Sequence, residues 1–466
     1  MGQSRDLDVI GNYHFFEREN RSLVYDFVNN ILYRPKKKTD YFLLREFIEQ
    51  YSRGEITLED CIEHRFRLFI ENFQSDKETF DSMKHFDEIS TISSKITLMV
   101  SQSCNLKCAY CYGHDGKFGS STGGFMSEEI GKNAMRFAVD RARKNGMKFI
   151  FVTFFGGEPL LNFSLMKHIV EFNKNSFPDI SFSYSTTTNL TLITQSIAEF
   201  IREHNISILV SLDGFKEVHD KNRVFKNGRG SYDAVMRGIN ILKKNKLSFS
   251  VRSTLPHEYY RSYEHIINHF EELGAQNIYI SRLCNYNDDV VDVFDANMEE
   301  LAEEFSILNE FHDRTHERIL KGEKPSHVPY TTMFERIHEA DKSLISCGVF
   351  KGSTTVSING DLYPCHRFVG MTGFCFGNIK DGVNINILNK LVKTMDKCWA
   401  RYLCKRGCAR DIAKNGGKFV DYTNEYCNLI KVSIEKALVA YYNIVTVRPS
   451  YIKEFSHKEI EVYNVI

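Results

Sequence analysis

The sequence predicts an α/β fold in which an open, partial (β/α)6 TIM-like barrel follows a small N-terminal α+β module and precedes a cysteine-rich region. Between residues 93 and 290, apolar strand patterns alternate with amphipathic helix patterns, which indicates a parallel sheet covered by helices. Before residue 90, short strand patterns precede helix patterns. After residue 346 this alternation ends, and seven of the 12 cysteines occur there.

Length and composition set the expected domain organisation. A chain of 466 residues is too long for one ordinary core, and 42% hydrophobic residues are enough to build several. The 60 basic residues balance the 60 acidic ones, so charge gives no indication of nucleic acid or an anionic membrane as a partner. We expect an N-terminal module, a barrel, a helical bridge, a cysteine-rich domain and a C-terminal helix with its tail, at 1–90, 91–290, 291–345, 346–430 and 431–466.

The cysteines indicate metal binding. Residues 1–12 carry no apolar signal segment and no stretch approaches the roughly 20 apolar residues of a membrane-spanning helix, so a cytoplasmic location is expected. Disulfides are rare in that reducing compartment, whereas clustered thiols there bind metals or do chemistry. Three cysteines lie within 104–111 and seven within 347–427, while Cys61 and Cys284 stand alone and are expected to be buried thiols.

The N-terminal module is predicted from short patterns. Residues 22–27 and 30–33 have the composition of two strands joined by a tight turn, and 40–51 has helical spacing of apolar residues. A second helix is expected after Thr57, because Thr57 and Asp60 form a capping-box pattern.

The barrel is predicted from six strand–helix units. Strands are expected at 95–100, 149–155, 180–187, 206–212, 247–254 and 277–282. Helices are expected at 127–144, 162–175, 194–204, 231–245 and 259–273. Six units suit an open, partial barrel better than a closed one of eight. Further helices are expected at 297–321 and 428–443.

The first cysteine group follows directly after the first barrel strand. Cys104, Cys108 and Cys111 have the spacing C-x3-C-x2-C, which puts three thiolates on one short loop. A 4Fe–4S cluster prefers four thiolates, so three leave one iron open, and an open iron can chelate the amino and carboxylate groups of an amino acid. A zinc site is the alternative, but zinc favours four ligands, commonly from paired C-x2-C units, and no matching second pair lies nearby.

The segment 93–290 resembles the radical S-adenosylmethionine (SAM) superfamily, because several of that family's motifs occur in order at successive strand ends. The C-x3-C-x2-C motif has an aromatic residue, Tyr110, before its last cysteine. The other motifs are Gly156-Gly157-Glu158-Pro159, Thr188-Asn189, Ser211-Leu-Asp213-Gly214, His219-Asp220-Lys-Asn222-Arg223, Gly228-Arg-Gly230-Ser231-Tyr232 and Arg252.

This resemblance implies that Cys104, Cys108 and Cys111 hold a 4Fe–4S cluster that cleaves SAM reductively. The resulting 5′-deoxyadenosyl radical would abstract a hydrogen atom from the substrate, while the protein orients the reacting atoms and excludes water. SAM contacts are implied at Tyr110, Gly156, Gly157, Glu158, Thr188, Asn189, Ser211, Asp213 and Arg252. The sequence identifies no catalytic acid or base; Tyr363, His366 and Asp213 are more simply structural.

The C-terminal third resembles the SPASM extension of these enzymes, which carries two auxiliary 4Fe–4S clusters. The resemblance assigns Cys347, Cys365 and Cys408 to the first of them and Cys398, Cys404 and Cys427 to the second, with zinc as the alternative metal. The family usually has a cysteine where this chain has Met395, and Cys375 is additional. We hypothesise that Cys375 replaces the missing ligand, so that seven thiolates divide as four plus three and one cluster has an open iron for a substrate thiolate. An incomplete, labile cluster or a non-cysteine ligand are the alternatives.

Two stretches, 363–370 and 398–408, are similar to radical maturases of ribosomal peptides, especially thioether-forming ones, although Arg406 stands where their motif has a glycine. The resemblance implies a cysteine-containing precursor peptide whose leader adds a strand to a sheet edge of the N-terminal module. A plain structural cap on the barrel is the alternative for that module. A low-potential electron donor of the flavodoxin or ferredoxin type is also implied.

Other functions share the same first half-reaction. Formylglycine formation on sulfatases, epimerisation and carbon–carbon crosslinking all begin with hydrogen abstraction. A zinc-bound peptide-binding scaffold without catalysis is a remote alternative, and the ordered GGE and SLDG motifs argue against it.

Overall fold

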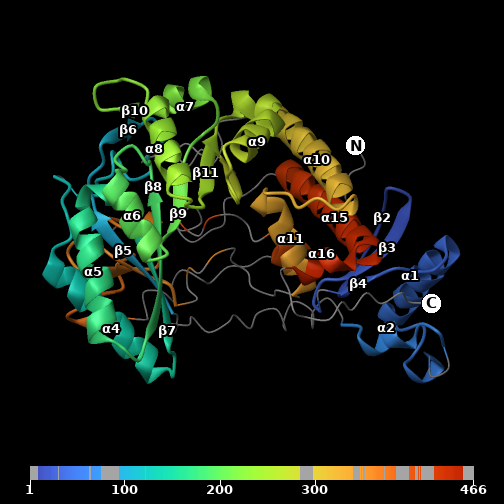
Figure 1. Cartoon of the computed structure of the whole chain (residues 1–466). Helices are drawn as coiled ribbons and strands as arrows, with labels where there is room; N and C mark the ends of the chain where they lie inside the picture. Colours follow the sequence, from blue (N-terminus) through green and yellow to red (C-terminus); the bar gives the residue numbers. More distant parts are fainter. Residues whose placement is uncertain are drawn as a thin grey trace.

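The structure of this protein is a computed structural model. It describes residues 9–29, 31–61, 64–74, 94–120, 122–283, 297–339, 352–371, 373–384, 398–404 and 424–454, and the single residues 347, 349, 408 and 410. Cys284, Met395 and Arg406 lie outside the described residues. Figure 1 shows a curved sheet with its helices on one side, the N-terminal module on the other and long helices between them.

Six parallel strands form the barrel sheet in the spatial order β12-β11-β9-β8-β7-β5. These strands are β5 (Lys95–Ser101), β7 (Phe149–Gly156), β8 (Ser181–Thr188), β9 (Ser207–Ser211), β11 (Ser250–Leu255) and β12 (Ile278–Arg282). Each matches one of the six expected strands, so the α/β class with a partial barrel is confirmed. Because all neighbouring pairs are parallel, the carboxyl ends of the strands meet at one edge of the sheet.

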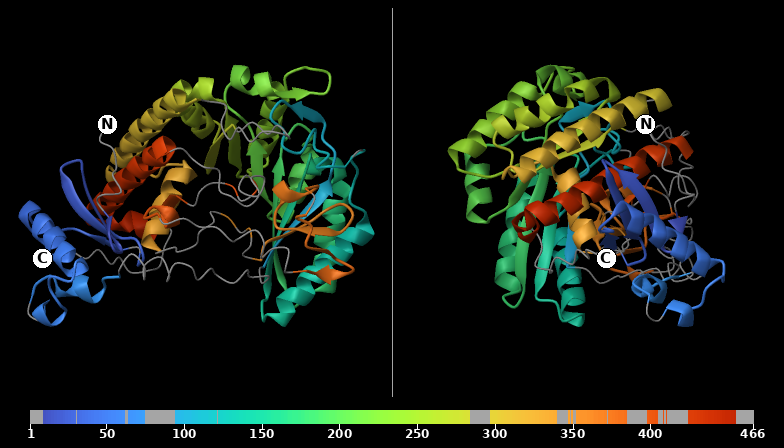
Figure 2. Two further views of the ribbon diagram at one scale, coloured as in Figure 1. Left: turned by 180° about the vertical axis from the view of Figure 1, so that it is seen from behind. Right: turned by 90° about the vertical axis from the view of Figure 1, so that its right-hand side faces the viewer.

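Helices cover the outer face of the curved sheet, as the two views in Figure 2 show. They are α4 (Glu128–Lys144), α5 (Phe163–Ser176), α6 (Gln195–Glu203), α7 (Lys216–Asn222), α8 (Tyr232–Lys244) and α9 (Tyr263–Glu272). Side-chain caps fix two helix starts: Ser127 accepts a hydrogen bond from the amide of Ile130, and Thr194 accepts one from the amide of Ile197. The core between sheet and helices is apolar, with Val152, Phe154, Met166, Ile208 and Val251 buried.

The C-terminal region extends the barrel sheet, which the sequence did not predict. Strand β13 (Thr354–Val356) pairs in parallel with β5, and β14 (Asp361–Tyr363), β15 (Gly377–Asn378) and β16 (Gly382–Val383) continue the sheet antiparallel. A separate two-stranded ribbon joins β6 (Leu106–Cys108) to β10 (Arg223–Phe225). Residues far apart in the sequence are therefore brought to the same edge of the barrel.

The N-terminal module is a four-stranded antiparallel sheet with helices on one side. Its strands are β1 (Val9–Ile10), β2 (Tyr13–Arg18), β3 (Arg21–Asp26) and β4 (Ile31–Tyr33), in that spatial order. The two expected strands correspond to β3 and β4, whereas β1 and β2 were not predicted. Helix α1 (Lys38–Ser52) is confirmed.

The helix expected after Thr57 is wrong in its length. The capping contacts form, since Asp60 Oδ2 accepts a hydrogen bond from the Thr57 amide at 2.8 Å, but the segment is a short 3-10 turn, Glu59–Cys61. A separate helix, α2 (Arg67–Glu71), follows. Cys61 and Phe66 are both buried in the module core, and residues five apart do not share a face of one straight helix.

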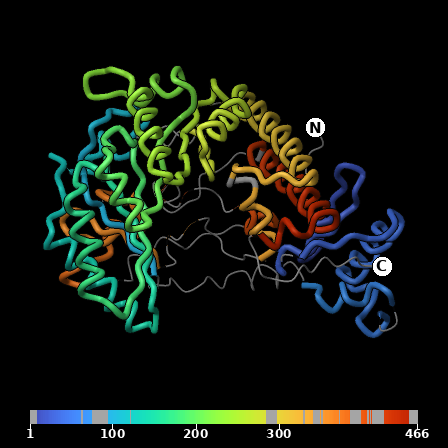
Figure 3. The backbone as a smooth tube through the Cα atoms, in the orientation of Figure 1, coloured from blue at the N-terminus to red at the C-terminus, as the bar shows by residue number. Residues whose placement is uncertain are grey.

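A second core joins the N-terminal module to the C-terminal helices. It is built by strands β2 and β3 together with α10 (Met298–Leu320), α11 (Val328–His338), α13 (Arg401–Cys404), α15 (Asn424–Val447) and α16 (Pro449–Lys453). Figure 3 shows the red C-terminal helix beside the blue N-terminal strands. Among the described residues, no helix has both the length and the apolar character needed to cross a bilayer.

Candidate active site at the carboxyl ends of the strands

The three-cysteine loop leaves the carboxyl end of β5 at a β-bulge. The register between β5 and β7 shifts between Met99 and Ser101, which turns the chain into the loop. The loop is then held by the β6–β10 ribbon, in which Cys108 lies opposite Arg223. The amide of Ala109 donates to the carbonyl of Asn222 at 2.9 Å. The cysteines are therefore anchored from two sides, by the barrel strand and by the ribbon.

The GGE segment packs directly against this loop. The amide of Gly157 donates to the Ser101 carbonyl at 2.8 Å, and the amide of Glu158 donates to the Ser103 carbonyl at 2.9 Å. A Cβ on Gly157 would lie 2.4 Å from the Ser103 carbonyl oxygen and 3.0 Å from the Cβ of Cys104. Glycine is required here because the two loops approach each other more closely than a side chain allows.

Glu158 connects the ends of two neighbouring strands. Its carboxylate accepts hydrogen bonds from the Thr188 hydroxyl at 2.7 Å and from the amides of Asn189 at 2.7 Å and Leu160 at 3.0 Å. Burial raises the pKa of this carboxyl to about 7, although those donors oppose the shift. Thr188 and Asn189 are therefore positioned by Glu158, and the GGE and Thr-Asn motifs act as one unit.

Asn189 reaches back to the cysteine loop. Its side-chain amide donates to Asn105 Oδ1 at 2.9 Å and lies 3.9 Å from the sulfur of Cys104. Asn105 in turn donates to the Thr191 hydroxyl at 2.8 Å. The loop, the end of β7 and the end of β8 thus form one connected polar network.

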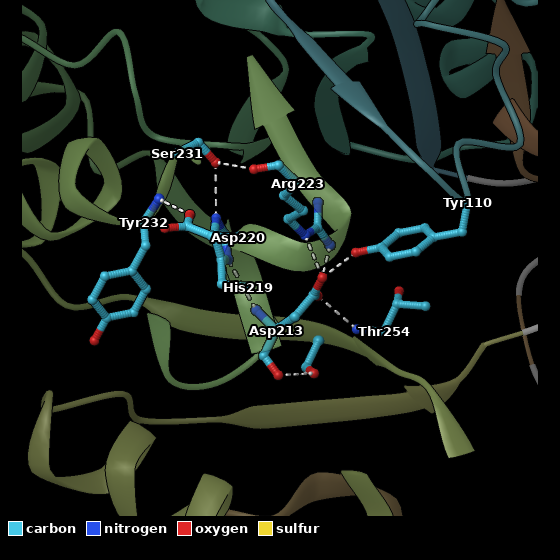
Figure 4. A network of polar contacts seen from close by, with 9 residues as sticks. Tyr110, Asp213, His219, Asp220, Arg223, Ser231, Tyr232 and Thr254 are labelled. Atoms are coloured by element: carbon cyan, nitrogen blue, oxygen red, sulfur yellow. Dashed lines mark hydrogen bonds and ion pairs between the residues drawn. The ribbon is translucent and has the colours of Figure 1, made fainter. Parts of the chain in front are cut away.

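Asp213 is the centre of a second network, drawn in Figure 4. Its carboxylate pairs with the Arg223 guanidinium at 2.8 Å and 3.0 Å and accepts hydrogen bonds from the Tyr110 hydroxyl and the Thr254 amide. Asp213 is fully buried, and the Arg223 guanidinium lies over the Tyr110 ring at 5.4 Å. Tyr110, which lies between two of the cysteines, is therefore tied to strands β9 and β11.

His219 and Ser231 complete this network. The Asp213 amide donates to His219 Nδ1 at 3.3 Å, so Nε2 carries the proton and donates to the Ser231 hydroxyl at 2.9 Å. Ser231 then donates to the Arg223 carbonyl at 2.8 Å. Burial lowers the pKa of His219 to about 4, which keeps the ring neutral. The SLDG, HDxxR and GxGSY motifs are thus joined in one hydrogen-bond network.

Two other expected site residues lie further along the sheet edge. Ser211 and Arg252 are register partners on β9 and β11. The His366 ring stacks on Phe155 with centroids 4.2 Å apart, and burial followed by the charges of Arg367 and Arg252 lowers its pKa to about 3. The cysteine-rich region therefore reaches the carboxyl edge of the barrel through His366.

The thiols of the loop fit an iron–sulfur cluster. Burial raises the pKa of Cys104 to about 12, and the neighbouring Cys108 and Cys111 contribute to the rise. Such thiols are protonated and unreactive at neutral pH unless a metal cation displaces the proton. Within the described part of the chain, no three His, Cys, Asp or Glu side chains come close enough to share a single metal ion. A cube of four irons holds its thiolates at separate corners, which suits three neighbouring cysteines better.

The other cysteines fall into two neighbourhoods. Burial raises the pKa of Cys365 to about 12, and Cys408 and Cys347 add to the shift, so these three lie near one another. The Arg367 guanidinium donates to the Cys408 sulfur at 3.5 Å. Cys398 and Cys404 instead pack against the core that joins α15 to the N-terminal strands, and Cys427 lies on α15. The assignment of these cysteines to two auxiliary clusters stays a prediction.

Comparison with known proteins supports the same reading of this edge. Residues 98–270 match the model of the radical SAM superfamily. This stretch contains the cysteine loop and both polar networks. The chain is a radical SAM enzyme.

Relatives of this radical SAM enzyme extend beyond the barrel. A cysteine-type anaerobic sulfatase-maturating enzyme of Clostridium novyi is 26% identical over 356 residues, which are 72% of this chain and 92% of that protein. The radical SAM cyclopropyl synthase TigE of Paramaledivibacter caminithermalis is 22% identical over 440 residues, 90% of this chain and 89% of that protein. The solved structure of native anSMEcpe with bound AdoMet superposes with a TM-score of 0.63 at 23% identity, covering 76% of this chain and 99% of that one. The family implies a 4Fe–4S cluster and SAM as cofactors.

Sequence reasoning missed Gly116, and it missed the role of Arg223, at this radical SAM site. Gly116 has a φ of +81°, and a Cβ there would lie 2.8 Å from the Cβ of Cys104 and 2.8 Å from the Cα of Gly157. Arg223 was noted only as part of a motif, although it pairs with Asp213 and lies opposite Cys108. The position of Arg223 opposite Cys108 results from the pairing of β6 with β10, and no local pattern in the sequence predicts that pairing.

Proposed function

We propose that this radical SAM enzyme modifies a ribosomally made precursor peptide by joining a cysteine sulfur of the peptide to a carbon atom. The 5′-deoxyadenosyl radical would remove one hydrogen atom from that carbon. As the carbon–sulfur bond forms, the thiol gives up its proton, and an auxiliary iron–sulfur cluster would accept the remaining electron. The peptide therefore loses two hydrogen atoms for each thioether. A low-potential flavodoxin- or ferredoxin-type protein is the proposed electron donor.

The residues of the barrel edge have separate proposed roles. Cys104, Cys108 and Cys111 would hold the 4Fe–4S cluster, and the neighbouring strand ends would hold SAM. When bound, cluster and SAM supply the one-electron chemistry needed to remove a hydrogen atom from an unactivated carbon. Glu158 fixes Thr188 and Asn189, so the polar groups that face this edge are in place before a ligand arrives.

The proposed SAM contacts are the set implied by the sequence, and the polar networks refine it. Ser211 and Arg252 lie side by side on neighbouring strands at the same edge. Glu158 and Asp213 are fully buried, and their carboxylates accept hydrogen bonds from groups inside the protein. We therefore assign these two carboxylates to positioning, and the backbone of residues 156–158 to direct contact.

The architecture of the N-terminal module is the main support for a peptide substrate. The module offers an antiparallel sheet whose outer strands are β1 and β4, which suits recognition of an extended leader by strand addition. It also exposes large apolar side chains, with Phe42 at 50%, Leu43 at 48% and Leu68 at 44% exposure, that a leader peptide would cover.

The cysteine neighbourhoods support two auxiliary clusters. We assign Cys347, Cys365 and Cys408 to the first and Cys398, Cys404 and Cys427 to the second. The first neighbourhood borders the barrel core and the second borders the core shared with the N-terminal module. An auxiliary cluster with an open iron would bind the thiolate of the substrate peptide.

Formylglycine formation on a sulfatase is the second candidate. The 26% identity with the sulfatase-maturating enzyme over 92% of that protein favours it. In that reaction the cysteine of the target loses its sulfur and becomes an aldehyde. The two candidates therefore leave different marks on the same residue.

Anaerobic co-expression with short cysteine-containing peptides encoded near the gene tests the proposal. The peptides are analysed by mass spectrometry before and after thiol alkylation. Loss of two hydrogen atoms per bridge, with cysteines that no longer alkylate, supports thioether formation. A control uses the enzyme with Cys104, Cys108 and Cys111 replaced by alanine, which should leave the peptide unchanged.

Two other results would overturn the thioether assignment. Loss of hydrogen atoms from a peptide whose cysteines still alkylate points to a carbon–carbon crosslink. An unchanged precursor, together with conversion of a sulfatase-derived cysteine peptide to a hydrazide-reactive aldehyde, assigns the enzyme to sulfatase maturation.

A further inference from the structure

The Asp213–Arg223 ion pair lies next to the three-cysteine loop. Arg223 and Cys108 are register partners in the β6–β10 ribbon, so the two residues face each other across the strand pair. The guanidinium also lies over the ring of Tyr110, the residue directly before Cys111. Two opposite charges are thus placed beside the residues that hold the cluster.

These charges are fixed in place and shielded from water. Asp213 has no exposed surface and Arg223 has 8%. Besides Arg223, the carboxylate accepts hydrogen bonds from Tyr110 and from the Thr254 amide. The backbone of Arg223 is held in turn by Ser231. Neither charge can swing away, and a buried fixed charge acts on its neighbours more strongly than a solvated one.

Both charges reach the cysteine loop directly. The Arg223 guanidinium meets it through the cross-strand pairing with Cys108 and through the ring of Tyr110. Asp213 meets it through the hydroxyl of Tyr110.

We propose that Arg223 and Asp213 are positioning residues that set the reduction potential of the cluster held by Cys104, Cys108 and Cys111. A cluster gains one negative charge when it takes up one electron. The Arg223 cation stabilises that reduced form and raises the potential, whereas the Asp213 anion destabilises it and lowers the potential. This inference rests on the radical SAM chemistry of the chain and is independent of which peptide is modified.

Removing each of the two charges should shift the reduction potential in opposite directions. A purely structural role would not give shifts of opposite sign. Arg223→Gln should lower the potential by about 59 mV, so that the ratio of reduced to oxidised cluster at a fixed solution potential falls about tenfold. Asp213→Asn should shift the potential in the other direction by a similar amount. The double variant should return close to the wild-type value.

The experiment is a redox titration of the reconstituted holoenzyme followed by electron paramagnetic resonance. The signal that changes on addition of SAM identifies the relevant cluster, and the Cys104, Cys108 and Cys111 alanine variant provides the background of the auxiliary clusters. Lys216→Gln and Asp233→Asn serve as matched controls, because Lys216 and Asp233 form an exposed ion pair at 2.6 Å in the same stretch. Both controls should keep the wild-type potential.

If Arg223→Gln or Asp213→Asn fails to retain its iron, two milder substitutions test the proposal instead. Arg223→Lys keeps the cation and should hold the potential near the wild-type value, whereas Tyr110→Phe removes a donor to Asp213 and should lower it. Shifts of Arg223→Gln and Asp213→Asn in the same direction, or wild-type potentials in iron-replete variants, would overturn the proposal. If Asp213→Asn contains no iron, an unchanged potential in Tyr110→Phe would also overturn the proposal.

Discussion

The imidazole of His14 stacks on the indole of Trp399 with ring centroids 3.8 Å apart. His14 lies on β2 of the N-terminal module, and Trp399 directly follows Cys398. Glu435 on α15 accepts from His14 Nε2 at 3.1 Å and from Arg18 Nε at 2.8 Å. The module that we propose binds the leader is therefore packed on the region that we propose holds the second auxiliary cluster.

Arg18→Gln should release this contact. Glu435 is only 3% exposed, and loss of the guanidinium leaves its charge with His14 alone, which we expect to cost about 3 kcal/mol of unfolding free energy. Lys38→Gln is the matched control, because the Lys38–Glu17 pair is exposed at 67% and 41% and should contribute under about 1 kcal/mol. Urea denaturation measures the stability, and hydrogen exchange should show faster opening of β2 in Arg18→Gln only. Equal effects of the two substitutions would contradict the coupling.

Gly157→Ala should remove the cluster of the cysteine loop. The new Cβ would lie 2.4 Å from the Ser103 carbonyl, so the loop that carries Cys104 must move. We expect a loss of about four iron atoms per chain in the reconstituted protein. Gly146→Ala is the control, since its φ is +68° but nothing lies within 4 Å, and it should cost about 1 kcal/mol without loss of iron. A Gly157→Ala protein with full iron would contradict the close approach.

Stability should depend on pH through His219. Its folded-state pKa of about 4 lies below the value of about 6.5 in an unfolded chain. Burial outweighs the opposing charges of Asp213 and Asp220, and the Arg223 cation adds to the lowering. The unfolded chain therefore binds more protons between these values, so the stability from the neutral ring is complete above about pH 6.5 and is lost as pH falls toward 4.

Comparison with His219→Gln measures the contribution of His219 to the pH dependence of the unfolding free energy. Between pH 7 and pH 5, the wild type should lose about 2 kcal/mol more unfolding free energy than the variant. Urea denaturation of both proteins at each pH gives the difference and cancels the contributions of other groups, including acid-labile clusters. Parallel pH profiles would show that His219 titrates normally.

Cys375 should belong to the same centre as Cys365. Its thiol donates to the Gly377 carbonyl at 3.2 Å, and it contributes, after burial, to the raised pKa of Tyr363 next to that centre. Cys365 and Cys375 both pack against the barrel core, whereas Cys398 and Cys404 do not.

A double variant tests this assignment. Cys365→Ala and Cys375→Ala should each lower the bound iron, and the double variant should lose no more than Cys365→Ala alone, because both remove the same cluster. Cys61→Ala, which alters a buried thiol of the N-terminal core, should lose none. Additive losses would place Cys375 at a different centre.

The sequence alone determined the radical SAM core. The spacing of Cys104, Cys108 and Cys111, the alternation of strands and helices, and the order of the GGE and SLDG motifs are all local patterns. Local patterns suffice here because a parallel sheet puts every strand's carboxyl end at one edge, so motif order along the chain predicts proximity in space.

Only the tertiary structure decided which residues act on one another at that edge. The pairing of Cys108 with Arg223, the addition of β13 to β5, and the stacking of His14 on Trp399 join segments with no shared pattern. The short strands at Val9–Ile10 and Gly377–Asn378 have too few residues to show a period, so their pairing follows from the surrounding packing. Glu158 and Asp213 read as ligand contacts in the sequence, yet burial and strand pairing direct both carboxylates to internal partners.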